Sequence, residues 1–416
     1  MNQERPVILG YDCVSPLGTE LEAQWSRAES GGSGVSLLTR FPLREGFPVR
    51  IAGQVAEIDT TPYPFLRPRE MAHWTSPVFK HGLLVVMRAL ARSGVEITPE
   101  IAPRTAVTFS SAIGGLDSLI DADRTLVATG RLPQPFMNPN SCINMVGGKV
   151  AIATGATGPI ASVITACATG SSSLILGAML IAQGMADVAI CGAVDFPLVE
   201  SIVAGFATMN GAYRPKDGEE PPPPRAASCP FSAFRRGFVV SEGAGCVVIA
   251  SRTFADAHGL PYAIELAGWG MTADAFHVVA PNPVTVRRCI GESLIHAGID
   301  PDDIDAVSAH AASTKIGDRV EADALREVFG VGIPPVSAAK SLLGHAMGAS
   351  SAIESILAME GMQRGVLLPT INHRPDPEIP LDCVTEGARS LDQEWVLKNA
   401  FGFGGCNACL VFRRVN

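Results

Sequence analysis

The segment Val163-Ile-Thr-Ala-Cys167-Ala-Thr-Gly170 decides how this chain folds. Its first residues are β-branched and apolar, as in a buried strand, and they lead through a cysteine into a small-residue helix expected at 171–183. A cysteine at a helix start meets free backbone N–H groups and the positive end of the helix dipole. Both favour a thiolate and can stabilise an oxyanion. Of the ten cysteines, Cys167 is therefore the one that we expect to react.

Around this segment, stretches that favour strands alternate with patterns that favour helices. We expect strands at 7–11, 105–109, 162–165, 188–191, 245–250, 263–268, 306–309, 336–337, 396–400 and 408–412. Further helices are expected at 76–92, 285–297, 318–329 and 346–362. Residues 214–230, with consecutive prolines at 221–224, are expected to form an exposed excursion. The alternation predicts an α/β protein with buried sheets.

Composition excludes several classes of protein. Hydrophobic residues make up 47% of the 416 residues, which is enough for a large core, and the net charge of −9 argues against a nucleic-acid partner. The apolar zone 151–194 is interrupted by glycine and proline, so it predicts buried core and no membrane insertion. The first residues do not resemble a signal peptide, and scattered reduced cysteines indicate a cytoplasmic location. One CxxC pair, at 406–409, lacks a second ligand pair, so no metal site is expected.

The sequence around Cys167 is repeated in outline further along the chain. Cys167-Ala-Thr-Gly-Ser-Ser-Ser is echoed by His345-Ala-Met-Gly-Ala-Ser-Ser, and an apolar helix follows each. Small residues at these positions would let two helices pack with their backbones close together. Two explanations stay open: a chance likeness between small-residue helices, or a duplicated fold with halves at 1–255 and 256–416.

Three more segments contain residue types suited to chemistry. One is Ser308-Ala-His310-Ala-Ala-Ser-Thr314, with Asp318 and Glu321 behind it; the second is Lys340-Ser-Leu-Leu-Gly-His345; the third is the glycine-rich Asn399-Ala-Phe-Gly-Phe403-Gly-Gly-Cys-Asn407. Each also has a purely structural interpretation. A lysine can be a surface residue, acidic residues can charge a helix start, and glycines can mark a hairpin.

Taken together, these motifs resemble the elongating β-ketoacyl-[acyl-carrier-protein] synthases, condensing enzymes of the thiolase fold. The resemblance runs from Val14-Ser-Pro-Leu-Gly18 through Ile113-Gly-Gly115 to the final strand. It implies a duplicated, five-layered α-β-α-β-α architecture. The family's catalytic triad falls on Cys167, His310 and His345, and its buried lysine on Lys340. Its associated carboxylates fall on a further set, expected to form a structural network: Asp318, Glu321 and Glu354.

The resemblance implies a decarboxylating condensation without metal or cofactor. Cys167 would accept an acyl chain as a thioester, and its N–H with that of Phe403 would form the oxyanion hole. Two neutral imidazoles, His310 and His345, would donate N–H groups to the thioester oxygen of a malonyl unit. They would thereby stabilise the enolate left when carbon dioxide departs. Lys340 would set the electrostatics of the site, and Phe403 would also act as a mobile gate.

The same resemblance implies substrate contacts and partners. Pocket residues are expected at positions that line the family's substrate channels: Thr314, Ile113, Phe206, Phe403 and Met137. The expected partners are an acyl carrier protein, carrying acyl and malonyl thioesters, and a second ketosynthase-like subunit, identical or paralogous. Phe136-Met137 would complete the acyl pocket across that interface.

Three departures from the family pattern favour a specialised pathway, such as polyketide or polyene synthesis. Ala312 stands where a threonine normally contacts the pantetheine arm, and Val278-Val279-Ala280 replace hydroxyl residues after His277. Arg69-Glu70 stands in place of a basic pair that often meets an acidic carrier. These changes predict a less polar tunnel and a dedicated carrier protein.

Other functions remain possible on the same fold. A non-catalytic subunit that sets chain length would lack the cysteine, so Cys167 argues against it. A thiolase would pair one histidine with a second cysteine; Cys406 slightly favours this alternative and His310 opposes it. A non-elongating acyltransferase of the same fold is a further alternative. An acyl-binding scaffold would load Cys167 without forming product.

Overall fold

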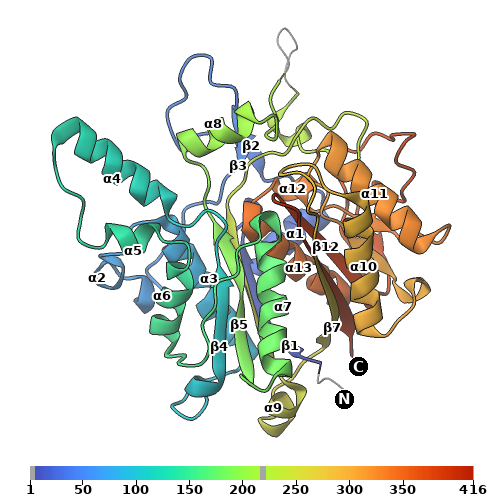
Figure 1. Cartoon of the computed structure of the whole chain (residues 1–416), viewed down its shortest axis with the longest axis horizontal. Coiled ribbons are helices and arrows are strands. Elements are labelled where there is room, and N and C mark those ends of the chain that lie inside the picture. Colours follow the sequence, from blue (N-terminus) through green and yellow to red (C-terminus); the bar gives the residue numbers. More distant parts are fainter. Residues whose placement is uncertain (1–4, 216–221, 416) are drawn as a thin grey trace.

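A mixed sheet forms the centre of the molecule. In the computed structural model, which describes residues 5–215 and 222–415, nine strands follow the order β4-β5-β6-β1-β7-β13-β12-β8-β9 (Figure 1). The strands are β1 (Val7–Val14), β4 (Thr105–Ser110), β5 (Val188–Asp195), β6 (Gly243–Ala250), β7 (Ile264–Ala273), β8 (Ala306–Ser308), β9 (Val336–Ser337), β12 (Trp395–Gly402) and β13 (Cys406–Arg414). Strands β1, β4, β5 and β6 are buried along their whole length, as apolar runs without alternation predict.

The two halves of this sheet repeat one topology. From its outer edge inward, the C-terminal half runs β9-β8-β12-β13-β7. If the five strands that this half adds to the large sheet are numbered in chain order, their order in space is 3-2-4-5-1. The N-terminal half runs β4-β5-β6-β1, and a parallel bridge from Val107 to Ile160 stands where its third strand would lie. Parallel and antiparallel pairings also match: β4–β5 and β8–β12 are parallel, whereas the two inner pairs of each half are antiparallel. The halves join where Val7 and Ile8 of β1 pair with β7.

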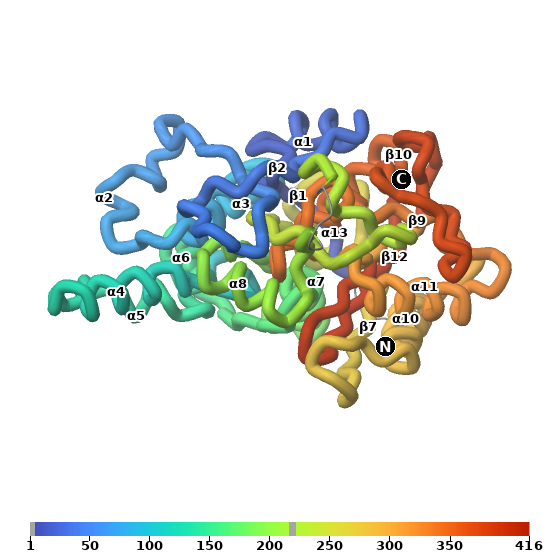
Figure 2. Tube along the Cα trace, turned by 90° about the horizontal axis from the view of Figure 1, so that it is seen from above, coloured from blue at the N-terminus to red at the C-terminus, as the bar shows by residue number. Residues whose placement is uncertain are grey.

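Helices lie in three layers around the two halves of the sheet (Figures 1 and 2). Helices α3 (Pro77–Ser93) and α6 (Met145–Thr154) cover the outer face of the N-terminal half. Helices α7 (Thr169–Ala182) and α13 (Met347–Arg364) lie side by side between the halves, and α10 (Pro283–Ala297) with α11 (Lys315–Phe329) covers the C-terminal half. The architecture is the expected thiolase-like, five-layered α/β fold.

Smaller elements decorate these layers. They are α1 (Leu21–Glu29), α2 (Pro68–Met71), α4 (Leu116–Thr129), α5 (Met137–Ser141), α8 (Glu200–Thr208), α9 (Arg252–Ala257), α12 (Lys340–Leu343), and the strand pairs β2 (Val35–Leu37) with β3 (Ile51–Gly53) and β10 (Val366–Leu367) with β11 (Arg389–Ser390). Helices α4 and α5 project from one side of the body in both views (Figures 1 and 2). Among the described residues, no helix is long and apolar enough to cross a membrane.

Local sequence signals explain where the longer helices begin and end. Pro77 opens α3, where its missing N–H needs no partner, and Gly94 closes it in the left-handed conformation with φ of 69°. Asn282 caps α10 by accepting the backbone N–H of Val284. Gly365 ends α13 with φ of 65°. These signals are visible in the sequence, and the predicted helices agree with the observed ones to within a few residues.

The strand predicted at 162–165 is wrong. Residues 161–165 belong to no ladder, because the segment meets the edge of β4 only at Val107, whose N–H donates to Pro159 O and whose carbonyl accepts the N–H of Ala161. The β-branched run therefore leaves an unpaired sheet edge. Of the predicted excursion at 214–230, residues 216–221 lie outside the described part. The segment 227–230 is buried, contrary to that prediction.

Candidate active site

Cys167 lies on a tight turn between residues 161–165 and α7. The 3₁₀ turn Ala166–Ala168 holds it, and Ala166 adopts the left-handed conformation with φ of 48°. The hydroxyl of Thr169 ties this turn together because it accepts the N–H of Thr165 and donates to Ala166 O. The cysteine itself is buried, with 6% of its surface exposed, and it faces a pocket. The turn, rather than a strand end, presents the thiol.

The two predicted histidines meet at this pocket. His310 follows β8, and His345 stands two residues before α13. His345 Nε2 lies 3.0 Å from Cys167 Sγ, and the two imidazole rings are 5.8 Å apart and nearly perpendicular. Thr314, another predicted residue, also lines the pocket. Residues far apart in the sequence thus surround one sulfur atom.

The pKa of the Cys167 thiol departs from the expectation of a ready thiolate. Burial raises this pKa to about 11, opposed by the charge of Lys340 and by a hydrogen bond from the backbone N–H of Phe403. The resting group is therefore a thiol, because loss of water outweighs the favourable helix start. The groups that would stabilise the sulfur anion are nevertheless in place around it.

Both histidines are held neutral. Burial lowers the pKa of His310 well below its usual value, and Lys340, His345 and Lys398 lower it further. Burial likewise lowers the pKa of His345, with the two lysines adding to the effect. A neutral imidazole carries one N–H, so each ring can donate one hydrogen bond into the pocket.

Ser350 orients His345 and was missed in the sequence. Its Oγ accepts the N–H of Ala346 at 2.8 Å and lies 3.0 Å from His345 Nδ1. Because the hydroxyl already accepts one N–H, its own proton is directed to Nδ1, which leaves the imidazole hydrogen on Nε2, toward Cys167. The only sequence signal was a hydroxyl one helical turn after the histidine.

A carboxylate and a lysine hold His310. The carboxylate of Glu321 accepts the backbone N–H groups of His310 and Ala311 at 2.8 and 2.7 Å. Lys340 Nζ donates to His310 O at 2.6 Å and lies 3.5 Å from Nδ1, while it pairs with Glu354 at 2.6 Å. The predicted lysine and these two predicted carboxylates therefore form one buried network behind the histidine.

Two aspartates fix the surrounding loops. Asp318, predicted from the sequence, accepts the backbone N–H of Phe231 at 2.8 Å and that of Thr314 at 3.0 Å. Asp195, which was not predicted, accepts the N–H of Ile113 at 2.8 Å and that of Ala349 on α13 at 3.2 Å. An aspartate at the end of the buried strand β5 was the available signal. These carboxylates position backbone rather than face the sulfur.

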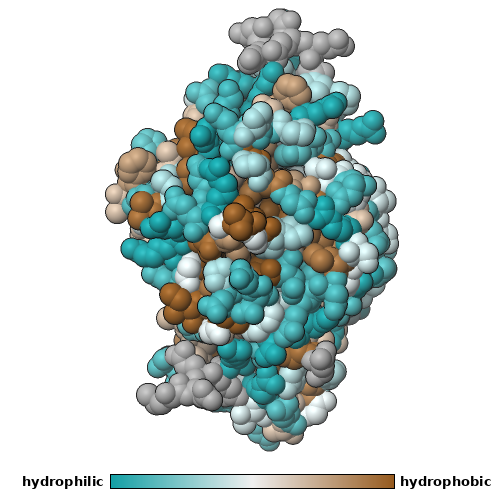
Figure 3. All heavy atoms as spheres, turned by 90° about the vertical axis from the view of Figure 1, so that its right-hand side faces the viewer, coloured by the Kyte–Doolittle hydropathy of each residue, from teal (hydrophilic) through white to brown (hydrophobic). Residues whose placement is uncertain are grey.

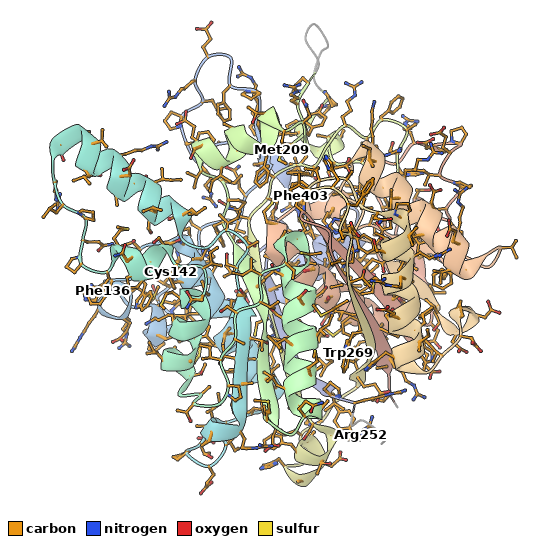
Figure 4. All side chains as sticks on the ribbon, viewed as in Figure 1. Phe136, Cys142, Met209, Arg252, Trp269 and Phe403 are labelled. Atoms are coloured by element: carbon orange, nitrogen blue, oxygen red, sulfur yellow. The ribbon has the colours of Figure 1, made fainter. Side chains whose placement is uncertain are left out.

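The glycine-rich turn brings Phe403 to the site (Figure 4). Gly404 and Gly405 have φ of 82° and 74°, a conformation that favours glycine. A Cβ on Gly402 would lie 2.3 Å from Thr165 O, so only glycine permits this approach to the cysteine turn. The turn is therefore a docked wall of the site, and not hairpin punctuation alone.

An apolar cluster extends from the histidines. The ring of Phe238, which sequence reasoning missed, lies 5.3 Å from His345 and 5.5 Å from Phe206. Ile113 and Phe403 pack on the same cluster. Met137 does not: it begins α5, next to Phe136, which lies far from Phe403 (Figure 4). The chain by itself therefore brings together all predicted pocket residues except Met137.

Comparison with known proteins identifies the family. A model described as "Beta-ketoacyl synthase, N-terminal domain" matches residues 3–255, and one described as "Beta-ketoacyl synthase, C-terminal domain" matches residues 263–374. The chain belongs to the β-ketoacyl synthase family. This confirms the resemblance drawn from the motifs.

Full-length relatives agree with this assignment. The 3-oxoacyl-[acyl-carrier-protein] synthase 2 of Coxiella burnetii is 34% identical over 421 residues, covering 100% of both chains. That of Staphylococcus aureus strain COL is 33% identical over 418 residues, covering 99% of this chain and 98% of the relative. This β-ketoacyl synthase is therefore an acyltransferase.

Solved structures share the fold over the same length. A β-ketoacyl synthase from Burkholderia phymatum STM815 superposes with a TM-score of 0.91 at 29% identity, covering 99% of this chain and 100% of that one. A second is described as a type II polyketide acyl-carrier protein in complex with its ketosynthase, with a TM-score of 0.90 at 27% identity. A third is described as the ishigamide ketosynthase/chain length factor, with a TM-score of 0.89 at 29% identity. Each match covers 100% of both chains.

Proposed function

We propose that this β-ketoacyl synthase joins an acyl chain held on Cys167 to a malonyl unit on an acyl carrier protein, with loss of carbon dioxide. The observation that carries the proposal is the convergence of a thiol and two neutral imidazoles on one pocket, with His345 Nε2 at 3.0 Å from Cys167 Sγ. Neutral imidazole N–H groups suit an enolate oxygen, because they donate without first needing a proton.

The reaction divides into transfer and condensation. Cys167 sulfur attacks the acyl thioester, and the carrier thiol leaves with the proton that the cysteine gives up. The N–H groups of Cys167 and Phe403 hold the transient oxyanion. A malonyl thioester then loses carbon dioxide, and the electrons of the broken C–C bond pass to its oxygen, which His310 and His345 hold as an enolate. The enolate carbon attacks the acyl carbonyl, a new C–C bond forms, and the cysteine sulfur is expelled as a thiolate, which takes a proton from water to return to the thiol.

The remaining residues shape these steps. Burial, with the charge of Lys340, keeps the imidazoles neutral, and the network of Asp318, Glu321 and Glu354 holds the backbone and charge around them. Thr314 would contact the pantetheine arm. The chain would extend along an apolar wall: Ile113, Phe206, Phe238 and Phe403.

The mouth of the pocket supports a specialised carrier protein. Val279, Ala280, Ala312 and Val320 line the pocket. Three apolar side chains beside its lining residues are largely exposed: Phe276 (69%), Val278 (66%) and Ile316 (60%). Figure 3 shows hydrophobic side chains gathered near the middle of the α10–α11 side of the molecule. A carrier of low charge, in polyketide or polyene synthesis, fits such a rim better than one recognised through basic residues. The structural likeness to polyketide ketosynthases adds support.

A second ketosynthase-like subunit would cover the unpaired edge of β4. Exposed apolar residues gather on the elements along this edge and on α4 beside them: Leu119, Val127, Leu132, Phe136, Ile152, Ile160 and Ile164. A patch of this kind marks an interface, and pairing at 162–164 would satisfy the free backbone groups there. Met137 would then reach the partner's acyl pocket. We further propose that residues 1–255 and 256–416 are two copies of one unit, which the repeated strand order supports.

The test supplies acyl-carrier and malonyl-carrier proteins and measures 3-oxoacyl product by mass spectrometry. Wild-type protein should form product, and the intact mass should show acyl groups on Cys167. Cys167→Ala, with the melting temperature as a control for folding, should do neither. Loading of Cys167 without product from any malonyl carrier would contradict condensation and favour a non-elongating acyltransferase.

A further inference from the structure

A second lysine, absent from the motifs that identify the family, lies in the core of the active-site network. Lys398 on β12 has no exposed surface, and its Nζ lies 2.8 Å from Glu354 Oε2. Lys340 takes the other oxygen, Oε1, at 2.6 Å. Two buried ammonium groups therefore share one carboxylate. A buried lysine is expensive to desolvate, so its retention here calls for a reason.

The shared carboxylate leaves Lys340 free to serve His310. Lys340 Nζ forms an ion pair with Glu354 Oε1 at 2.6 Å, without hydrogen-bond geometry. Its three N–H groups therefore remain available to His310 O at 2.6 Å and to Nδ1 at 3.5 Å. If Lys398 were absent, no other described side chain would pair with Oε2, and the carboxylate could rotate to take both oxygens to Lys340. That rotation would draw Lys340 away from Nδ1, which is the contact that keeps the His310 hydrogen on Nε2.

Charge balance gives a second reason. The ionisable groups that act on His310, or that pair with those groups, are Cys167, Glu321, Lys340, His345, Glu354 and Lys398. With two lysines and two glutamates charged and the remaining groups neutral, their sum is zero. Removal of Lys398 would leave one negative charge close to the place where an enolate forms, and would make a proton on His310 easier to hold.

We propose that Lys398 is a positioning residue for the decarboxylation step, acting through Glu354 and Lys340 on His310. The inference rests on the proposed condensation. In this role Lys398 balances the buried negative charge and fixes the orientation of the Glu354 carboxylate. The thiol transfer step depends on Cys167, His345 and Phe403, and therefore depends less on Lys398.

The experiment separates the two half-reactions in Lys398→Met, which keeps length and removes charge. Carbon dioxide release from malonyl carrier should fall by about tenfold to a hundredfold, as expected for loss of one nearby charge. Acyl loading of Cys167 should change by less than about threefold. The acidic limb of the pH profile for carbon dioxide release should move to higher pH, since His310 becomes easier to protonate. Lys80→Met, a partly exposed lysine on α3, is the matched control.

A second substitution tests charge directly. Lys398→Met/Glu354→Gln restores a neutral sum, so it should release carbon dioxide faster than either single variant. If Lys398→Met does not fold, the comparison of the double variant with Glu354→Gln decides the same question. Unchanged release and an unmoved acidic limb in Lys398→Met, or a double variant no faster than the singles, would overturn the proposal. Failure of wild-type protein to release carbon dioxide would instead overturn the proposed function.

Discussion

Substitution of Gly170 tests whether the crossing of α7 and α13 sets the geometry of the site. A Cβ at this position would lie 2.5 Å from the backbone N of Ala352 on α13 and 2.7 Å from its Cβ. Ordinary contacts need 3.4–4 Å, so Gly170→Ala requires the helices to separate by roughly 1 Å. Overpacking of this kind costs about 1–3 kcal/mol, more than the gain in helix propensity of at most about 1 kcal/mol.

The separation should also affect chemistry, because α7 follows Cys167 and α13 follows His345. Their reacting atoms are now 3.0 Å apart. A displacement of about 1 Å at a reacting centre can lower the rate about a hundredfold. We therefore expect Gly170→Ala to melt at a lower temperature and to load acyl groups on Cys167 about a hundred times more slowly.

The assay follows the intact mass of the protein after mixing with acyl carrier. Gly291→Ala, inside α10 with no atom within 4 Å of the new Cβ, is the matched control. It should gain about 0.5–1 kcal/mol of stability and load normally. A Gly170→Ala protein that melts and loads like wild type would refute the close crossing. Lower stability with normal acyl loading of Cys167 would show that the crossing of α7 and α13 does not control the geometry of Cys167 and His345.

Three further changes have defined outcomes. Ser350→Ala removes the hydroxyl that donates to His345 Nδ1, at a cost of about 1–3 kcal/mol, so carbon dioxide release should fall about tenfold or more. An unchanged kcat would contradict the argument that Ser350 keeps the imidazole hydrogen on Nε2. Burial holds the pKa of His81 at about 3, below its unfolded value near 6.5, so acid destabilises the fold through this window. Between about pH 6.5 and 4.5 the free energy of unfolding from urea titrations should fall by about 2–3 kcal/mol more in wild type than in His81→Phe; equal losses would exclude this group. Because burial raises the pKa of Cys167 to about 11, its alkylation by iodoacetamide should accelerate about tenfold per pH unit above neutrality. Peptide mass spectrometry measures this rate, and a rate that does not change with pH would show that the resting group is a thiolate.

Much of the site could be predicted because the family motifs are local. Cys167, His310, His345 and the turn at Phe403 each stand in a short segment whose residue types suggest chemistry. The likeness between the segments that begin at Cys167 and His345 also predicted close helix packing. The close approach of Gly170 to Ala352 confirms it, since a Cβ on Gly170 would lie 2.5 Å from Ala352 N. These signals needed no knowledge of long-range contacts.

The rest depends on contacts between distant residues. Lys398 stands in an apolar strand where nothing in the sequence indicates that Glu354 lies opposite. Asp195 gains its role only because β5 ends beside the loop at Ile113 and the start of α13. The error at 162–165 has the same origin, since a β-branched run forms a strand only if a neighbour pairs with it, and here the sheet ends.

The repeated strand order has a consequence for how function is divided along the chain. The N-terminal half supplies the Cys167 thiol to the pocket, whereas the C-terminal half supplies the imidazoles of His277, His310 and His345. Core residues of the two halves, such as Ile175 and Ile356, belong to one hydrophobic cluster, so the two halves pack on a shared core. Each half repeats the strand order and presents a different group to the pocket from the start of its own helix. Truncation to either half would therefore separate the thiol from the imidazoles.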